Sequence, residues 1–193
     1  MTSEKPEFNE LEISKITNRI YLSSHKASTD LWELQMIGIT HILSIYLPAE
    51  PLFAGQGINY KIITDILDMP NPRNRNRVLQ KLPETNTFIH EALTTSDNSK
   101  VLIHCEVGCS RSVTFLVAYL MSVTKKTSHC VISAVRKKRI WANPNPGFRY
   151  VLEQFFDNGV GVKKEFDRLG VTLGFKHEIN SELFGRKKSC FLE

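Results

Sequence analysis

A short segment near the middle of the chain combines a cysteine and an arginine at a spacing that suits phosphate chemistry. Five residues separate Cys105 from Arg111. A loop of this length can curl so that its backbone N–H groups converge on one anion at the start of a following helix. The guanidinium of Arg111 can add paired hydrogen bonds to two phosphate oxygens, which a lysine could not reproduce. The residues expected to bind phosphate are Glu106, Val107, Gly108, Cys109, Ser110 and Arg111.

The same surroundings make Cys105 a candidate nucleophile. Converging N–H groups and the positive end of a helix dipole favour a thiolate, which is the reactive form of cysteine. Ser112 can donate a hydrogen bond toward Cys105 and ease its departure as a leaving group, and Gly108 permits the backbone to approach the anion or to adopt a positive φ. We expect His104 to order the loop rather than act as a base, because an ester attacked by a thiolate requires an acid for its leaving oxygen.

The flanking residues predict a strand that enters this loop and a helix that leaves it. Residues 101–103 form a short apolar run typical of a central strand, and residues 113–123 form a longer one that indicates a buried helix. Further strands are predicted over 19–22, 39–45 and 60–66, and further helices over 31–37, 128–138 and 147–156. Because strands and helices alternate, we predict an α/β fold with a central, mainly parallel sheet flanked by helices. The phosphate-binding loop then lies between a strand end and a helix start.

Some helix boundaries can be predicted from capping and breaking residues. Ser28 or Thr29 can cap the helix over 31–37, and Gly38 can end it. Pro83 interrupts the apolar helical pattern over 78–93, so regular helix is expected only after Pro83. Residues after about Gly159 show no clear apolar face.

Composition sets the broad class of the protein. With 41% hydrophobic and 23% charged residues in 193, the chain is near the globular average, so neither disorder nor a membrane protein is indicated. A net charge of +5 suits anionic partners, but net charge alone indicates association and does not identify a reaction. We do not expect nucleic-acid binding. The first residues lack a signal-peptide pattern, and four sparse cysteines suit a reducing compartment. We therefore expect a protein of the cytoplasm, the nucleus or both, and we do not expect it to associate with membranes.

The segment from His104 to Ser112 resembles the His-Cys-x5-Arg-Ser signature of the cysteine-dependent protein tyrosine phosphatase superfamily, in its dual-specificity branch of small atypical type. Segments that resemble this branch follow in the same order at 18–22, 38–43, 88–89, 118–119 and 143–148. The resemblance implies hydrolysis of phosphotyrosine and phosphoserine or phosphothreonine monoesters through a cysteinyl-phosphate intermediate. It also implies phosphoprotein substrates and no cofactor. We divide the chain into a flexible N-terminus (1–12), a catalytic domain (13–158) and a C-terminal extension (159–193).

The resemblance further implies a general-acid aspartate on a loop that follows the strand predicted over 60–66. Two residues are candidates, Asp65 and Asp68. We assign the acid to Asp68, because it begins a loop rich in Pro and Asn. Asp65 lies within the apolar run and is expected to fix local structure.

Two other functions stay open. The segments 68–70 and 143–145 also resemble the phosphoserine/threonine/tyrosine-interacting proteins, which use this fold as a binding module and typically lack the nucleophile. Retention of Cys105, Arg111 and Asp68 favours an enzyme. The alternating arginines at 73, 75 and 77 could attract acidic substrates or a second phosphate, so hydrolysis of phosphoinositide or RNA phosphates remains an alternative.

A metal site is not expected near the cysteine. His104, Cys105 and Cys109 have no second pair of ligands to complete a tetrahedral zinc site, and Arg111 would repel a cation. The basic run 136–139 is interpreted as a set of cations that stabilise a helix C-terminus. The sequence leaves the oligomeric state open.

Overall fold

A five-stranded sheet organises the fold, with the strand order β1-β2-β5-β3-β4. In the computed structural model, residues 9, 11–68, 72–157 and 160–185 are described. The strands are β1 (Ser14–Lys15), β2 (Ile20–Ser24), β3 (His41–Ile45), β4 (Asn59–Ile63) and β5 (Val101–Cys105). β1 pairs antiparallel with β2, whereas β2 with β5, β5 with β3, and β3 with β4 pair in parallel. The predicted α/β class with a mainly parallel central sheet is confirmed.

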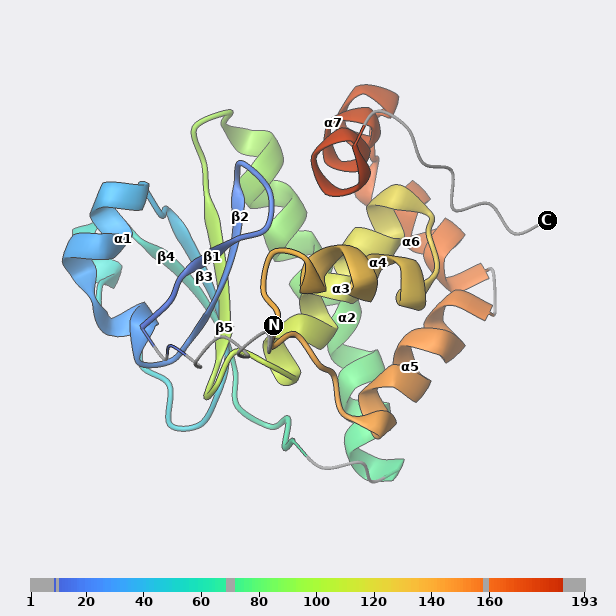
Figure 1. The fold of residues 1–193 in the computed structure, drawn as a ribbon, viewed down its shortest axis with the longest axis horizontal. Helices are drawn as coiled ribbons and strands as arrows, with labels where there is room; N and C mark the ends of the chain where they lie inside the picture. The colour runs from blue at the N-terminus through green and yellow to red at the C-terminus, as the bar shows by residue number, and fades with distance from the viewer. Residues whose placement is uncertain (1–8, 10, 69–71, 158–159, 186–193) are drawn as a thin grey trace, which may run out of the picture.

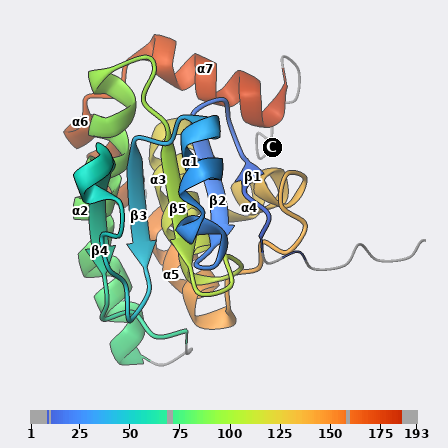
Figure 2. The same cartoon turned by 90° about the vertical axis from the view of Figure 1, so that its left-hand side faces the viewer.

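Helices cover both faces of this sheet (Figures 1 and 2). α1 (Leu31–Ile37) lies on one face, and the other helices lie on the opposite side. These are α2 (Pro72–Thr95), α3 (Arg111–Thr124), α4 (Ser128–Arg136), α5 (Pro146–Asp157), α6 (Val160–Leu169) and α7 (Leu173–Phe184). Within the described residues, no helix is both long and apolar enough to cross a bilayer.

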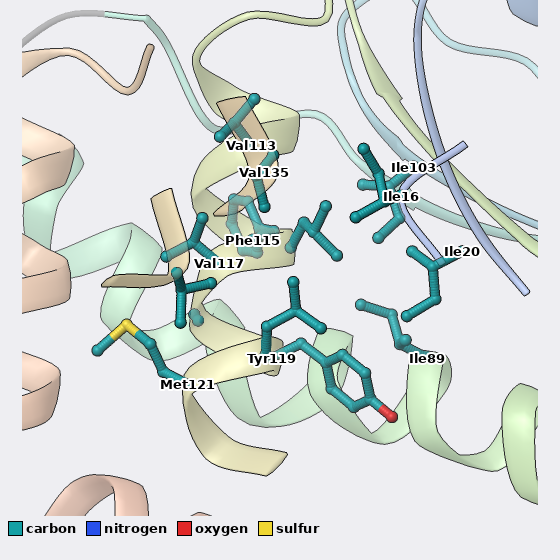
Figure 3. Packing of buried hydrophobic residues seen from close by; sticks show 14 of the residues in the cluster. Ile16, Ile20, Ile89, Ile103, Val113, Phe115, Val117, Tyr119, Met121 and Val135 are labelled. Atoms are coloured by element: carbon teal, nitrogen blue, oxygen red, sulfur yellow. The ribbon is translucent and has the colours of Figure 1, made fainter. Parts of the chain in front are cut away.

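Alternate side chains of the strands contact these two helical layers. In β5, Val101 and Ile103 lie in the main core, whereas Leu102 lies in a smaller cluster with Leu34 of α1. α3 is enclosed by the main core, because all 14 of its residues are buried. Figure 3 shows its apolar side chains packed near residues of β2, β5 and α2. The segment from β5 to α3 is therefore held rigidly at both ends.

α1 spans the predicted residues but is capped differently. Its N-cap is Asp30, whose carboxylate accepts a hydrogen bond from the N–H of Glu33 at 3.0 Å. The predicted caps, Ser28 and Thr29, instead lie in a short 3₁₀ helix (Ala27–Thr29), so that prediction is wrong. Gly38 ends the helix with a φ of 82°, as predicted.

α2 contradicts the prediction that regular helix begins after Pro83. The helix continues through this proline. An internal proline removes one backbone hydrogen bond and costs about 3 kcal/mol or more. Val78, Leu82 and Ile89 are each fully or almost fully buried, and one such side chain contributes about 1.5–3 kcal/mol. Core packing on both sides of the proline therefore outweighs the local preference.

Two helices lie beyond residue 159, where the sequence showed no clear apolar face. The main core includes four buried residues from this segment, Val162, Val171, Ile179 and Leu183. α6 is also tied to α2 by a buried carboxylate, because Glu165 accepts hydrogen bonds from Asn86 at 3.0 Å and from Nε of Arg168 at 2.8 Å. These helices therefore share the core of the preceding segment.

The remaining predicted elements are present, with their ends shifted by a few residues. The strand predicted over 60–66 ends at Ile63, and the helix predicted over 128–138 ends at Arg136. The division of the chain at residue 158 stays a prediction. The flexible N-terminus predicted over 1–12 falls mostly outside the described residues, as does residue 159 at the start of the C-terminal extension.

We predict that Pro83→Ala raises the free energy of unfolding by about 1–3 kcal/mol, because alanine restores the missing backbone hydrogen bond in α2. Urea unfolding followed by circular dichroism measures this change. Glu91→Ala, at an exposed position of the same helix, is the control and should change stability by less than about 0.5 kcal/mol. A destabilised Pro83→Ala variant would contradict the interpretation.

Candidate active site

The sulfur of Cys105 is the centre of the candidate site. Cys105 is the last residue of β5 and Arg111 is the first of α3, so residues 106–110 form the connection, here called the phosphate loop. The N–H of Gly108 donates a hydrogen bond to Sγ of Cys105 at 3.2 Å, and Oγ of Ser112 lies 3.3 Å from the same sulfur. The predicted nucleophile and its two predicted neighbours are therefore brought together.

Arg139 supports the phosphate loop from behind and was missed in the sequence analysis. The side chain is 1% exposed, and its Nε donates to the carbonyl of Gly108 at 2.8 Å. Its Nη2 donates to the carbonyl of Val107 at 3.3 Å, and its Nη1 donates to Oγ of Ser14 at 3.0 Å. The interpretation of this residue as a helix-terminal cation is wrong, because α4 ends at Arg136 and the Arg139 guanidinium contacts the loop.

Two backbone N–H groups from outside the loop hold two further loop carbonyls. His25 donates to the carbonyl of Glu106 at 3.0 Å, and Asn143 donates to that of Cys109 at 2.7 Å. In a trans peptide, the N–H of the next residue points opposite to the carbonyl. The Val107 carbonyl, which Arg139 holds, shows the consequence, because the N–H that follows it belongs to Gly108 and donates to the sulfur of Cys105.

Gly108 is required by a close contact with β2. Its φ is +76°, a conformation that other residues rarely adopt. A Cβ at this position would lie 2.3 Å from the carbonyl oxygen of Ser23 and 2.8 Å from Nη2 of Arg139. The predicted positive φ is confirmed, and the contacts that exclude a side chain are with the backbone of β2 and with Arg139, whereas the predicted approach to an anion stays a prediction.

Arg111 presents an unused donor in the site. Its side chain is 10% exposed, and its Nη2 donates to a carboxylate oxygen of Glu106 at 2.7 Å. The buried Nε has no hydrogen-bond partner among the described residues. The guanidinium carbon lies 6.0 Å from the centre of the Tyr46 ring. The guanidinium is therefore oriented by one nitrogen while another stays available to an anion.

His104 lies behind the nucleophile and is 3% exposed. Burial, with a further contribution from His25, lowers its pKa to about 4. The two imidazole rings are 5.7 Å apart, and Nδ1 of His104 has no hydrogen-bond partner within the described part of the chain. The ring is therefore neutral near pH 7, although a hydrogen bond with the backbone of Cys105 acts to raise its pKa.

Asp68 is joined to the phosphate loop, whereas Asp65 is not. Oδ1 of Asp68 accepts hydrogen bonds from Oγ of Ser110 at 2.7 Å and from Nδ2 of Asn145 at 2.6 Å. The N–H of Asn145 donates in turn to Oγ of Ser110 at 3.1 Å. Asp65 is exposed, and its backbone carbonyl accepts from Arg77 at 3.3 Å. Asn145 was not predicted as a site residue, although the Pro-rich segment 143–147 was a signal.

The remaining loop residues differ in exposure. Val107 is 46% exposed, and Cys109 is half-buried. Burial raises the pKa of the Cys109 thiol, which lies 3.8 Å from the carbonyl oxygen of Val107. Among the described residues, no cluster of three or more His, Cys, Asp or Glu could hold a metal ion.

Comparison with known proteins places this geometry in a family. Residues 20–158 match the family model of the dual specificity phosphatase catalytic domain. The chain therefore belongs to this family, as the resemblance indicated.

Individual relatives agree with the family assignment. Dual specificity protein phosphatase 22 of Xenopus laevis is 38% identical over 143 residues, which cover 74% of this chain and 64%, less than two thirds, of the relative. The crystal structure of DUSP15 has a TM-score of 0.73 and 33% identity, and covers 82% of this chain and 94% of that chain. The human tyrosine phosphatase-like serine/threonine/tyrosine-interacting protein has a TM-score of 0.64 and 27% identity. The match covers 77% of this chain and 97% of that chain.

We predict that Arg139→Met lowers the free energy of unfolding by about 2–4 kcal/mol, because the buried carbonyls of Val107 and Gly108 each lose a donor. The same variant should bind inorganic phosphate more weakly. Urea unfolding and phosphate titration calorimetry measure the two effects. Lys138→Met, at an exposed position next to it, is the control; equal stability of the two variants would refute the role of Arg139.

Proposed function

We propose that this chain hydrolyses phosphate monoesters of tyrosine, serine and threonine in phosphoproteins through a cysteinyl-phosphate intermediate. The observation that carries this proposal is the convergence of the Gly108 N–H and the Ser112 hydroxyl on the sulfur of Cys105. Donors aimed at a sulfur stabilise negative charge on it, and the thiolate is the form that attacks phosphorus. The start of α3 adds the favourable end of a helix dipole.

Substrate binding is assigned to Arg111 and to the N–H groups of the phosphate loop. Nε of Arg111 is buried without a hydrogen-bond partner among the described residues, which is costly unless an acceptor binds there. A phosphate dianion supplies such an acceptor and can accept several hydrogen bonds at once. The carboxylate of Glu106 is 60% exposed, so a phosphate can displace it from Arg111 into solvent.

In the first chemical step, the Cys105 thiolate attacks phosphorus. A sulfur–phosphorus bond forms while the ester oxygen–phosphorus bond breaks. The protonated carboxyl of Asp68 gives its proton to the leaving oxygen, which departs as an alcohol or a phenol. The hydrogen bonds from Ser110 and Asn145 hold Asp68 at the edge of the loop for this transfer.

In the second step, water hydrolyses the cysteinyl phosphate. The Asp68 carboxylate accepts a proton from water, whose oxygen attacks phosphorus, and the sulfur–phosphorus bond breaks. Ser112 donates its hydrogen bond to the departing thiolate, which regenerates Cys105. Arg111 and the loop N–H groups stabilise charge on the equatorial oxygens in both steps.

The geometry favours turnover over a pure binding module. The tyrosine phosphatase-like serine/threonine/tyrosine-interacting protein shares the fold, but this chain holds Cys105, Arg111 and Asp68 around one loop. A module that only binds phosphate has no need of a nucleophile or of a proton donor. The cytoplasmic or nuclear location of the protein stays a prediction.

The arginine-rich start of α2 gives less support to a substrate with a second phosphate. The Arg75 guanidinium lies 4.9 Å from the centre of the Tyr150 ring, and Arg77 donates to the carbonyl of Asp65. Two of the three arginines in this segment therefore have partners within the protein. Phosphoinositide and RNA phosphates accordingly rank below phosphoproteins as substrates.

We predict that Cys105→Ser abolishes release of phosphate from para-nitrophenyl phosphate but retains binding of inorganic phosphate, because the loop and Arg111 remain. Arg111→Lys should lower turnover by about 10²–10³-fold, since a lysine cannot replace the paired donors. Cys130→Ser, in α4, is the control for loss of a thiol. The mechanism is refuted if Cys105→Ser retains activity within about tenfold, the size of a minor rate effect.

We predict that Asp68→Asn slows hydrolysis of alkyl phosphates by about 10²–10⁴-fold and slows activated aryl phosphates much less, because a poor leaving group depends on proton donation. Steady-state kinetics on a series of leaving groups measures the difference. Asp65→Asn is the matched control and should hydrolyse alkyl and aryl phosphates at the rates of the unmutated chain. If Asp65→Asn gives the leaving-group dependence instead, the assignment of the acid is wrong.

A further inference from the structure

A basic hollow lies at the end of α3 that is distant from Cys105. It has a volume of about 620 Å³, and the residues that define it are Lys125, Lys126, Leu173, Lys176 and His177. None of the residues that line it is acidic. The 14 residues of α3 separate it from the phosphate loop by about 21 Å. The basic hollow is therefore distinct from the candidate active site.

Aromatic rings hold the three lysine ammonium groups at this surface. Nζ of Lys125 lies 3.7 Å from the centre of the Phe166 ring, and Nζ of Lys176 lies 5.8 Å from the same ring. Nζ of Lys126 lies 5.0 Å from the centre of the Phe184 ring. Cation–π contacts of this kind orient an ammonium group without neutralising its charge.

The charges of Lys125 and Lys126 act on Lys176. Burial lowers the pKa of Lys176, and the charges of Lys125 and Lys126 lower it further. Lys176 also lies in the first turn of α7, where the helix dipole disfavours a cation. The negative end of the α3 dipole stabilises the cations of Lys125 and Lys126. It does not explain the cation of Lys176, which belongs to another helix.

Lys125 has a backbone conformation that a lysine rarely adopts. Its φ is 58°, and it is the one residue other than glycine with positive φ among the described residues. It closes the C-terminus of α3, where its N–H donates to the carbonyl of Met121 at 2.9 Å. Glycine is the usual residue in this position. Backbone strain of this kind is often found at functional sites.

We propose that the basic hollow binds the phosphate group of a phosphorylated segment in a protein partner. A phosphomonoester carries a charge of about −1.5 to −2 and three acceptor oxygens, which suit a hollow lined by cations such as Lys125 and Lys176. Leu173 is 80% exposed at the hollow and offers apolar contact to a residue beside the phosphate. A concave site suits one phosphorylated side chain, whereas a membrane requires an extended basic face. The choice of a phosphoprotein rests on the proposed function, while the anion site does not.

Nuclear magnetic resonance titration of the full chain tests this proposal. The chain carries Cys105→Ser to prevent turnover, and the probe is a phosphoserine peptide with an apolar residue beside the phosphoserine. We expect the amide signals of Lys125, Lys176 and His177 to shift as peptide is added. The peptide concentration that saturates these shifts should differ from the one that saturates the shifts of the phosphate loop. Combining Lys125→Gly with Lys176→Gln should weaken this second site by about tenfold or more.

The control combines Lys163→Gln with Lys164→Gln, which removes two charges from exposed positions of α6 outside the basic hollow. This control should retain the second site. Glycine suits the backbone at Lys125, so the test variant should fold, and its thermal unfolding midpoint verifies this.

Three results would overturn the proposal. The first is the absence of shifts at the basic hollow, and the second is an equal loss of affinity in the control. The third is binding of phosphatidylserine vesicles through these lysines without binding of the peptide. Turnover of para-nitrophenyl phosphate by the unmutated chain is measured separately. Its absence would refute the proposed function but would leave the result on the anion site intact.

Discussion

The orientation of the peptide groups in the phosphate loop is the constraint on which the site depends. The four carbonyls from Glu106 to Cys109 are bound by groups outside the loop, and the Gly108 N–H, which follows one of them, donates to the sulfur of Cys105. If one peptide flipped, a carbonyl oxygen would face the bound anion and repel it. The donors come from His25, Asn143 and Arg139, which lie in segments that are distant in sequence. The electrostatic potential at Cys105 is therefore produced by the tertiary structure as much as by the signature motif.

Arg139 shows how the protein stabilises a buried cation for this purpose. A guanidinium removed from water is destabilising unless its N–H groups find acceptors. Here the carbonyls of Gly108, Val107 and Glu12 and the hydroxyl of Ser14 accept from its three nitrogens. Two of these acceptors belong to the phosphate loop, and the other two lie in or just before β1. The short antiparallel edge strand is thereby coupled to the loop through one side chain.

The parts of the site that the sequence could predict are those that are local in the chain. Cys105 and Arg111 occupy one strand–loop–helix unit, so their spacing alone indicated a phosphate-binding loop. The assignment of Arg139 failed because its contact with the loop spans 31 residues, and the contact of Asn145 with Asp68 spans 77 residues. Local rules likewise delayed the start of a helix until after Pro83, where burial in the assembled core outweighs the missing hydrogen bond. The general fold class was predictable because it needs only the alternation of strands and helices.

Glu106 gives Arg111 a partner that a phosphate can replace with little rearrangement. An ion pair with an exposed member contributes only about 0–1 kcal/mol to stability. Charge-assisted hydrogen bonds between arginine and phosphate are roughly twice as strong as hydrogen bonds between neutral groups. The carboxylate side chain is 60% exposed and can rotate into solvent. α3 is buried along its whole length, so the backbone of Arg111 is fixed. Under the proposed function, substrate binding would require one exposed side chain to move while the loop N–H groups stay in place. Donors that need no reorganisation are the kind that stabilise a transition state most effectively.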